Sequence, residues 1–147
     1  MTLRYLLDTR IVSIPVWKEP DSRVLSRLEA IGPECAIASP VWHELTFGCS
    51  RMPKGKRRNA LEAYLRDVVH SSFPILPYDE AAASWHGVER ARLELAGRPA
   101  PFVDGQIAAI AHVHRLILVT ANDRDFSAFT GLLLENWLTQ PRRKTKN

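Results

Sequence analysis

Three acidic residues follow or interrupt apolar segments at places where packing does not require a carboxylate. Asp8 comes directly after the apolar run RYLL, Glu44 lies among apolar residues in VWHEL, and Asp104 begins an apolar helical stretch. Carboxylate oxygens with room for water are the ligands that Mg²⁺ and Mn²⁺ prefer. A metal ion held by them activates water for in-line attack on a phosphodiester. The residue types therefore point to metal-dependent hydrolysis.

Each of these acids also has a purely structural explanation. Asp8 could cap a helix expected to begin near Ile11, and Glu44 could face solvent on an amphipathic helix. Asp104 could be a favourable first-turn residue whose ionised form the helix dipole stabilises. A second polar group follows the strand LILVT, where turn chemistry also favours such residues; it consists of Asn122, Asp123 and Asp125. A shared site is predicted only if the fold brings these side chains together.

Short apolar runs alternate with longer stretches of helical period, a pattern typical of a parallel sheet covered by helices. The expected strands are Arg4 to Leu7, Ala36 to Ala38 with their flanks, Phe73 to Leu76, Leu116 to Thr120 and Leu132 to Leu134. The expected helices run from Pro20-Asp21-Ser22 to about Ile31, from Pro40 to about Gly48, from Lys56 to Val69, from the Asp79 cap to before Gly97, and from about Phe102.

Helical spacing predicts which side chains the last three helices bury. The expected stripes are Leu61, Leu65 and Val68 in the first of them, Ala81, Trp85, Val88 and Leu95 in the second, and Ile107, Ile110 and Ala111 in the third.

The element order predicts an α/β fold, a three-layer α/β/α sandwich with a central, mostly parallel sheet of the doubly wound type. Ligands of such folds bind beyond the carboxyl ends of the strands, where the strand order reverses. Asp8 and the group after LILVT both follow strands, so the acids should meet at that edge. Bare carboxylates about 4 Å apart repel by several kcal/mol, so we expect a cation among them.

Length and composition predict a single domain. The chain has 147 residues and 46% hydrophobic content, enough for one core. We expect the domain to span 1–140 and a basic, disordered tail to follow at 141–147. No apolar run reaches the length of a membrane span and no signal peptide is evident, so a cytoplasmic protein is expected. Cys35 and Cys49 form no CxxC pair and should be reduced and partly buried.

The net charge of +4 is local rather than general. The chain has 20 Lys and Arg against 16 Asp and Glu, and four of the basic residues lie in the tail. A second cluster falls where no acid occurs from Leu45 to Leu61; it consists of Arg51, Lys54, Lys56, Arg57 and Arg58. Such a cluster steers a phosphate backbone. It could grip RNA or meet a protein partner, or it could be a solvated loop.

Four segments resemble the signature regions of PIN-domain nucleases, particularly VapC-type toxins of bacterial toxin–antitoxin pairs. They are YLLDT at Tyr5 to Thr9, VWHEL around Glu44, PFVDGQIAAIA around Asp104 and TANDRDF at Thr120 to Phe126. The similarity continues through PILPYDEAAA at Pro74 to Ala83 and ENW at Glu135 to Trp137. It implies a Mg²⁺-dependent endoribonuclease, with Mn²⁺ as a substitute, that is usually dimeric and is inhibited by a small VapB-like antitoxin.

The resemblance also assigns roles to particular residues. The metal-binding acids would be Asp8, Glu44 and Asp104, with Asn122 completing the catalytic group. The supporting residues would be Thr9, Arg10, Asp123 and Asp125.

Arg10 departs from the family pattern, whose first motif normally continues Asp-Thr-Asn. An Arg offers only donors and a fixed positive charge, so it cannot replace an Asn. It could sit among the carboxylates as a built-in counter-cation and weaken Mg²⁺ binding, or it could swing outward and meet the RNA backbone. The first alternative predicts that Arg10→Asn raises Mg²⁺ affinity.

Other chemistries lack their motifs: no GxSxG elbow, phosphate-cradling glycine loop or HExxH zinc motif occurs, and the five histidines show no metal-ligand spacing. Two rival functions stay open. One is a nucleic-acid-binding or antitoxin-binding protein that has lost turnover through Arg10. The other is a DNA-directed nuclease, because nothing in the motifs reads a 2′-hydroxyl.

Overall fold

The computed structural model describes residues 2–138, so the predicted basic tail lies outside the described residues. A five-stranded sheet in the order β3-β2-β1-β4-β5 forms its centre, and every strand pair is parallel. The strands are β1 (Tyr5–Leu7), β2 (Cys35–Ala38), β3 (Ile75–Leu76), β4 (Ile117–Val119) and β5 (Leu134–Glu135). Each expected strand is present, which confirms the α/β prediction.

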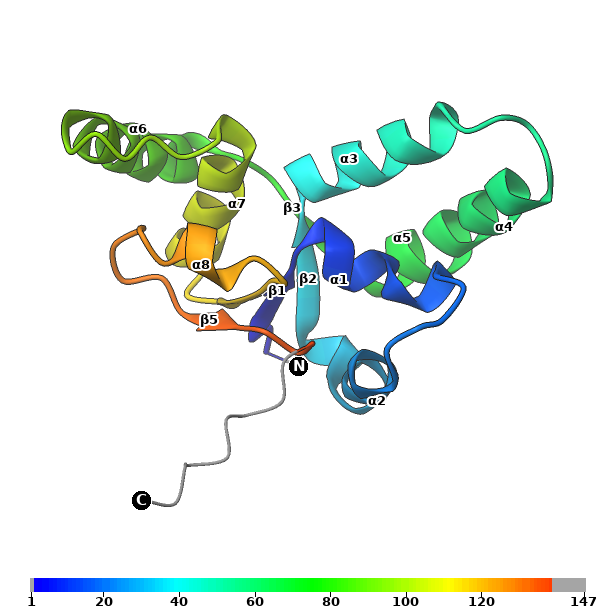
Figure 1. Ribbon diagram of the computed structural model, residues 1–147. Coiled ribbons are helices and arrows are strands. Elements are labelled where there is room, and N and C mark those ends of the chain that lie inside the picture. The colour runs from blue at the N-terminus through cyan, green and yellow to red at the C-terminus, as the bar shows by residue number, and fades with distance from the viewer. Residues whose placement is uncertain (1, 139–147) are drawn as a thin grey trace, which may run out of the picture.

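Helices lie on both sides of the sheet (Figure 1). They are α1 (Thr9–Ser13), α2 (Ser22–Ile31), α3 (Ser39–Ser50), α4 (Lys56–Tyr64), α5 (His70–Ser72), α6 (Glu80–Leu95), α7 (Phe102–Val113) and α8 (Asp123–Phe126). Short 3-10 turns at Ile14–Val16 and Gly32–Glu34 follow α1 and α2, and a π-helical turn at Leu65–Val69 follows α4.

The central strands are buried throughout because both of their faces are covered. Every residue of β1 and β2 is buried, as expected for apolar runs in a parallel sheet with helices on both sides. Cys35 and Cys49 are free thiols, and both are more deeply buried than the predicted partial burial. Within residues 2–138, no helix is both long enough and apolar enough to cross a membrane.

Two predicted helix starts are confirmed by their caps. The Asp21 carboxylate accepts hydrogen bonds from the backbone N–H groups of Arg23 and Val24. The Asp79 carboxylate accepts one from the N–H of Ala82. Both caps satisfy donors that the first turn of a helix leaves unpaired.

The predicted buried stripe of α6 is wrong. Val88 and Leu95 are 71% and 89% exposed, and only Trp85 of the predicted set packs partly against the core. The residues that α6 buries are Ala82, His86, Glu89 and Leu93. Two of these are polar, and hydrogen bonds satisfy them: His86 bonds with Tyr78, and Glu89 with Arg92 of the same helix and with the Thr130 N–H.

The burial predicted for the helix that begins at Lys56 is correct at Leu65 and wrong at Val68. Leu65 is buried as expected, but Val68 is 42% exposed and Val69 is buried in its place. The π-helical turn at Leu65–Val69 explains the change, because each π turn holds more residues than an α turn and so shifts the following side chains. In α7, by contrast, Ile107, Ile110 and Ala111 are all buried as predicted.

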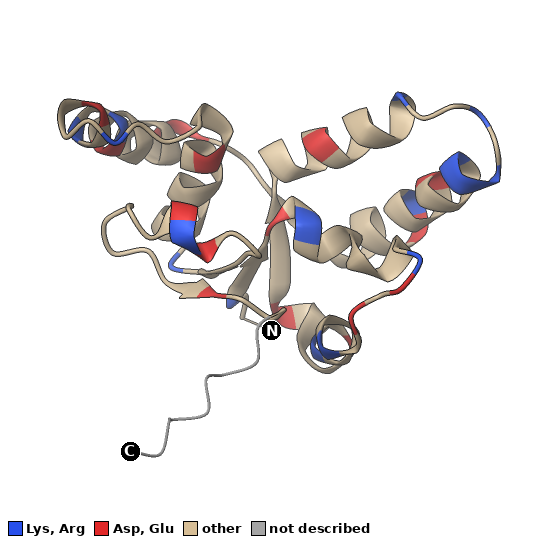
Figure 2. Cartoon of the chain, in the orientation of Figure 1, with Lys and Arg blue, Asp and Glu red and all other residues tan. Residues whose placement is uncertain are grey.

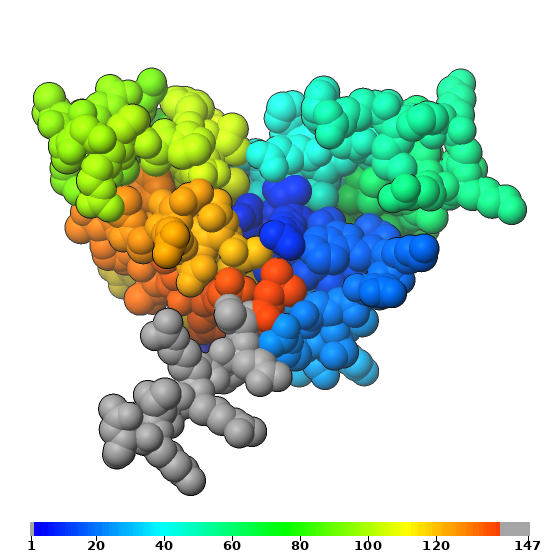
Figure 3. Space-filling model, in the orientation of Figure 1, coloured from blue at the N-terminus to red at the C-terminus, as the bar shows by residue number. Residues whose placement is uncertain are grey.

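The helices form two arms with a hollow between them. The space-filling view shows this notch between the α6–α7 arm and the α3–α4 arm, with N-terminal residues in blue at its base (Figure 3). The carboxyl ends of the strands point toward this notch (Figure 1).

Candidate active site

The notch lies where the strand order reverses. From β1 the chain adds β2 and β3 on one side and later β4 and β5 on the other, so β1 and β4 are neighbours. Their register pairs Leu7 with Val119 and brings the next residues, Asp8 and Thr120, to the same edge. Ligands of open α/β sheets bind at such a switch point.

A pocket of about 410 Å³ occupies this edge. Its lining residues are Asp8, Thr9, Arg10, Glu44, Asp104, Ile107, Thr120, Ala121 and Asn122. We call this the acidic pocket. It brings together the three predicted metal-binding acids, although they come from three separate parts of the chain.

Asp8 is held at both carboxylate oxygens. Oδ1 accepts a hydrogen bond from the Thr9 N–H at 2.8 Å, and Oδ2 accepts one from the Thr120 hydroxyl at 2.9 Å. Burial raises the pKa of Asp8, the nearby Glu44 adds to that rise, and the two hydrogen bonds oppose it. Asp8 also caps α1, so the structural and functional explanations of this residue both apply.

Glu44 projects from α3 into the notch. Its Oε2 accepts a hydrogen bond from the Thr9 hydroxyl at 2.8 Å. The expected apolar surroundings are absent, because Glu44 is exposed while its neighbours Val41 and Leu45 turn into the core. Glu44 is therefore an outward-facing residue of an amphipathic helix and also a wall of the acidic pocket.

Asp104 lies in the first turn of α7. Burial, and then the carboxylates of Asp8, Asp125 and Glu44, raise its pKa to about 6. The helix dipole favours the ionised form of Asp104, but burial and the like charges outweigh it and make this carboxyl harder to ionise than an ordinary Asp. The pocket thus concentrates negative potential at a partly buried point.

Close packing against α6 fixes the start of α7. A methyl group at Gly105 would overlap the His86 side chain, so only glycine allows this approach. The His86 ring also packs against Phe102, with ring centroids 4.9 Å apart. Its Nδ1 shares a hydrogen bond of 2.8 Å with the Tyr78 hydroxyl. These contacts position the backbone that carries Asp104.

The polar residues that follow β4 lie in two places; they are Asn122, Asp123 and Asp125. Asn122 lines the acidic pocket, and its Nδ2 donates a hydrogen bond to Oδ2 of Asp125 at 2.8 Å. Asp125 is near enough to raise the pKa of Asp104. Asp123 does not line the pocket and accepts a hydrogen bond from Asn136, which follows β5. Asn122 and Asp125 are therefore placed to support the site, and Asp123 is not.

Arg10 lines the acidic pocket but makes no ion pair with its carboxylates among residues 2–138. Its guanidinium carbon lies 5.4 Å from the centroid of the Trp17 ring. The Arg10 side chain is therefore turned outward and does not sit among the carboxylates as a counter-cation.

Thr120 is the site residue that sequence reasoning did not single out. It is fully buried, donates to Asp8 and accepts a hydrogen bond from the Asn122 N–H at 3.0 Å. Thr120 therefore ties the two strand ends together. Its sequence signal is a hydroxyl residue at the carboxyl end of the strand that pairs with the strand before Asp8.

None of the predicted RNA-binding cluster lines the acidic pocket, and only Arg57 of its members lines the groove beside it. Basic positions gather on the connection between α3 and α4 and at the start of α4 (Figure 2). Arg58 is engaged within the fold, since it donates to Glu62 at 2.8 Å and to the Met52 carbonyl at 3.1 Å. Arg51 stacks on Phe47. Lys54 and Lys56 are exposed, and Arg57 lines a groove beside the pocket.

The donor set fits a hard divalent cation. Among residues 2–138, no three His, Cys, Asp or Glu side chains lie close enough together to hold a metal ion as they stand. The carboxylates are nevertheless electrostatically coupled, because Asp8, Glu44 and Asp125 all raise the pKa of Asp104. Three carboxylates around a solvent-filled pocket are the oxygen ligands that Mg²⁺ and Mn²⁺ prefer.

The chain belongs to the PIN domain family, whose model matches residues 5–132. It is similar to the "tRNA(fMet)-specific endonuclease VapC" of Shigella flexneri, with 34% identity over 136 residues that cover 92% of this chain and 98% of that protein. It is also similar to "Toxin FitB" of Neisseria gonorrhoeae, with 30% identity over 90% of this chain and 97% of that protein.

Solved structures agree with the family. A structure of FitAB bound to an IR36 DNA fragment superposes with a TM-score of 0.86 at 26% identity, covering 95% of this chain and 99% of that one. VapBC2 from Rickettsia felis, bound to a DNA fragment from its promoter, has a TM-score of 0.78 at 30% identity, covering 92% and 99%. These likenesses confirm the predicted fold and family.

Proposed function

We propose that this protein is a VapC-type toxin, a Mg²⁺-dependent endoribonuclease that hydrolyses RNA phosphodiester bonds. The observation that carries the proposal is the meeting of Asp8, Glu44 and Asp104 in one pocket at the switch point of the sheet. The similarity to a protein named an endonuclease supports the reaction class.

The acids Asp8, Glu44 and Asp104 would hold Mg²⁺, or Mn²⁺ in its place. The chemistry supplied by the bound ion is Lewis-acid activation of water and neutralisation of charge on the phosphate oxygens. Asp8 is preorganised because both of its oxygens accept hydrogen bonds. Thr9 orients Glu44 through its hydroxyl. In the metal-free pocket the pKa of Asp104 is raised to about 6, and a bound cation would stabilise its ionised form.

We also propose that a cognate VapB-like antitoxin restrains the enzyme and that two copies of the chain associate. The antitoxin is supported by the similar complex VapBC2 and by a similar chain from a toxin–antitoxin complex of Klebsiella pneumoniae. Association is supported by apolar side chains of the α6–α7 arm that face solvent, among them Val88, Leu95 and Phe102. A mass for the isolated protein near 16.6 kDa in light scattering would contradict association.

The main rival is a binding protein in which Arg10 has weakened catalysis. The contact of Arg10 with Trp17, and its lack of an ion pair with the pocket acids in residues 2–138, support the active enzyme instead. Equal Mg²⁺ affinities of the wild type and Arg10→Asn would support the active enzyme, because Arg10 would then not weaken metal binding. A clear gain of affinity in the variant would favour the weakened site.

The direct test incubates purified protein with structured RNA or single-stranded DNA in Mg²⁺, Mn²⁺ or chelator. Cleavage of RNA alone, dependent on the metal and lost in Asp104→Asn, is the expected result. Cleavage of DNA would favour the DNA-directed nuclease. Activity that persists in Asp104→Asn would contradict the assignment of the site.

A further inference from the structure

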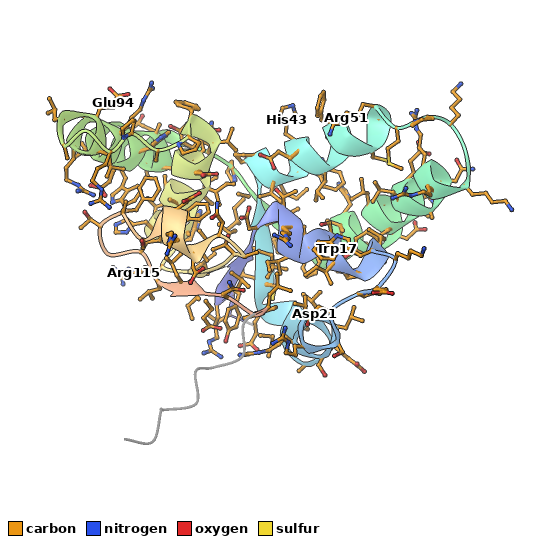
Figure 4. All side chains as sticks on the ribbon, viewed as in Figure 1. Trp17, Asp21, His43, Arg51, Glu94 and Arg115 are labelled. Carbon is orange, nitrogen blue, oxygen red and sulfur yellow. The ribbon has the colours of Figure 1, made fainter. Side chains whose placement is uncertain are left out.

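Arg10 and Trp17 form the border between the acidic pocket and a second hollow. Arg10 lines the acidic pocket, and Trp17 lines an adjacent groove of about 490 Å³. Thr9 and Glu44, joined by a hydrogen bond of 2.8 Å, line both, so the two hollows adjoin across this pair. Trp17, labelled in Figure 4, follows the 3-10 turn after α1 and lies on the α1 side of the notch.

Two more cations line the groove that Trp17 lines. Lys18 follows Trp17 in the chain, and Arg57 reaches the groove from α4. None of Arg10, Lys18 and Arg57 makes an ion pair among residues 2–138. We call Arg10, Trp17, Lys18 and Arg57 the basic shelf. It offers one aromatic ring and three unneutralised positive charges beside the acids.

This arrangement answers an electrostatic difficulty. A pocket of three carboxylates repels a polyanion, so a substrate strand needs positive charge close to the cut bond. A guanidinium that stacks on an indole ring is held in place without losing its charge, unlike one paired with a carboxylate. Its planar donors also match the oxygens of a phosphate. Trp17 is half-buried, and the part of its ring that lines the groove can stack on an unpaired base.

We propose that the basic shelf binds the single-stranded RNA next to the cleaved bond, with Arg10 on a phosphate and a base stacked at Trp17. This inference rests on the proposed ribonuclease function and assigns Arg10 a substrate-positioning role at the position where the family carries Asn. Binding of an acidic protein segment to the same shelf is the competing possibility.

The experiment measures binding of a short, labelled single-stranded RNA by fluorescence anisotropy in chelator, using Asp104→Asn as the background so that no cleavage occurs. Arg10→Asn should weaken binding about tenfold and reduce the steepness of the salt dependence by about 0.7, as expected for one lost phosphate contact. Arg10→Lys should keep the salt dependence because it keeps the charge. Trp17→Leu should weaken binding roughly tenfold through lost stacking, with the salt dependence unchanged.

The matched control is Arg27→Asn in the same background. Arg27 also stacks on a tryptophan, with its guanidinium carbon 5.4 Å from the ring of Trp137, but it belongs to α2, on the other side of the molecule from the notch (Figure 1). It should bind RNA like the background protein. Equal affinities and salt dependences for Arg10→Asn and Arg27→Asn would overturn the shelf. So would a loss confined to antitoxin binding.

Cleavage by the chain with native Asp104, measured in parallel, separates this inference from the proposed function. If Arg10→Asn loses RNA binding while the wild type cuts no RNA, the shelf stands and the ribonuclease proposal fails. If the wild type cuts RNA and Arg10→Asn binds it normally, the ribonuclease stands and the shelf is wrong.

Discussion

Asp104 and Glu89 are carboxylates withdrawn from solvent on adjacent, packed helices, yet their environments act in opposite directions. The neighbours of Asp104 include three carboxylates, and its pKa is raised to about 6. Glu89 is paired with Arg92 through two hydrogen bonds of 2.9 Å and accepts a third from the Thr130 N–H at 2.7 Å. Those bonds lower the pKa of Glu89 to about 2.

The difference separates a carboxylate that serves stability from one that serves chemistry. Glu89 is already satisfied, and it joins α6 to the segment after α8 through Arg92, which also donates to the Ala128 carbonyl. Asp104 has no cationic partner among residues 2–138, so its charge is available to a ligand. Unequal effects of replacing the two acids would support this division.

The largest effect is expected from Asp104→Asn. Removing one of three cation-binding carboxylates should lower RNA cleavage by about a thousandfold or more, because such ions supply several kcal/mol of transition-state stabilisation. The fold should survive, since the change relieves repulsion. Single-turnover cleavage measures the loss, and Asp67→Asn, at an exposed acid paired with Arg66, is the control. Similar cleavage rates for Asp104→Asn and Asp67→Asn would contradict a catalytic role for Asp104.

Glu89→Gln should show the opposite pattern, with a loss of stability. We expect the free energy of unfolding to fall by about 1 to 2 kcal/mol, because the buried Glu89 loses the charge that the Thr130 N–H and the partly exposed Arg92 stabilise. Denaturant unfolding measures this change. Glu94→Gln, at an exposed pair on the same helix, should cost less than about 0.5 kcal/mol. Equal losses of stability in Glu89→Gln and Glu94→Gln would contradict the stabilising role of the Glu89–Arg92 pair.

Gly105→Ala tests the contact that joins the two regions. The added methyl group meets the His86 ring, so we expect a loss of about 1 to 2 kcal/mol and a drop in cleavage as Asp104 shifts. Combining the change with His86→Ala should cost less than the sum of the two single changes. Additive effects in this double-mutant cycle would show that the two residues do not meet.

The smallest effect is on the pH dependence of stability in the metal-free protein. The pKa of Asp104 lies above its usual 3.8, so the stability it contributes is full below that value and is lost as pH rises through about 6. The pKa of Glu89 lies below its usual 4.5, so its contribution is full above that value and is lost as pH falls through about 2. Thermal melting measures these changes. The loss of stability on raising the pH through about 6 should be absent in Asp104→Asn, and the loss on lowering it through about 2 should be absent in Glu89→Gln. Identical profiles would contradict both assignments.

Much of this organisation is readable from local sequence. RYLL and LILVT predict two buried strands, and Asp8 stands directly after the first. An α/β fold then brings strand ends to one edge, which is enough to predict that Asp8 and the later acids meet. Asp21 and Asp79 mark helix starts because capping depends on residues close in the chain.

The remainder depends on contacts between distant segments. Helical spacing alone suggests that Val88 and Leu95 are buried, but α6 buries Glu89, whose partners include Arg92 nearby and Thr130 far along the chain. The buried face of α6 carries polar residues that have hydrogen-bond partners, so hydropathy alone makes it look like an exposed face. The role of Thr120 likewise requires knowing that β4 pairs with β1.

Calorimetric titration of Mn²⁺ and Mg²⁺ into the wild type, Asp104→Asn and Glu89→Gln tests most directly whether the acidic pocket is a cation site. We predict that the wild type and Glu89→Gln bind the metal equally, more tightly at pH 8 than at pH 6, because the ion competes with the proton on Asp104. Asp104→Asn should bind it far more weakly. Undiminished binding by Asp104→Asn, or no binding by the wild type, would contradict the account.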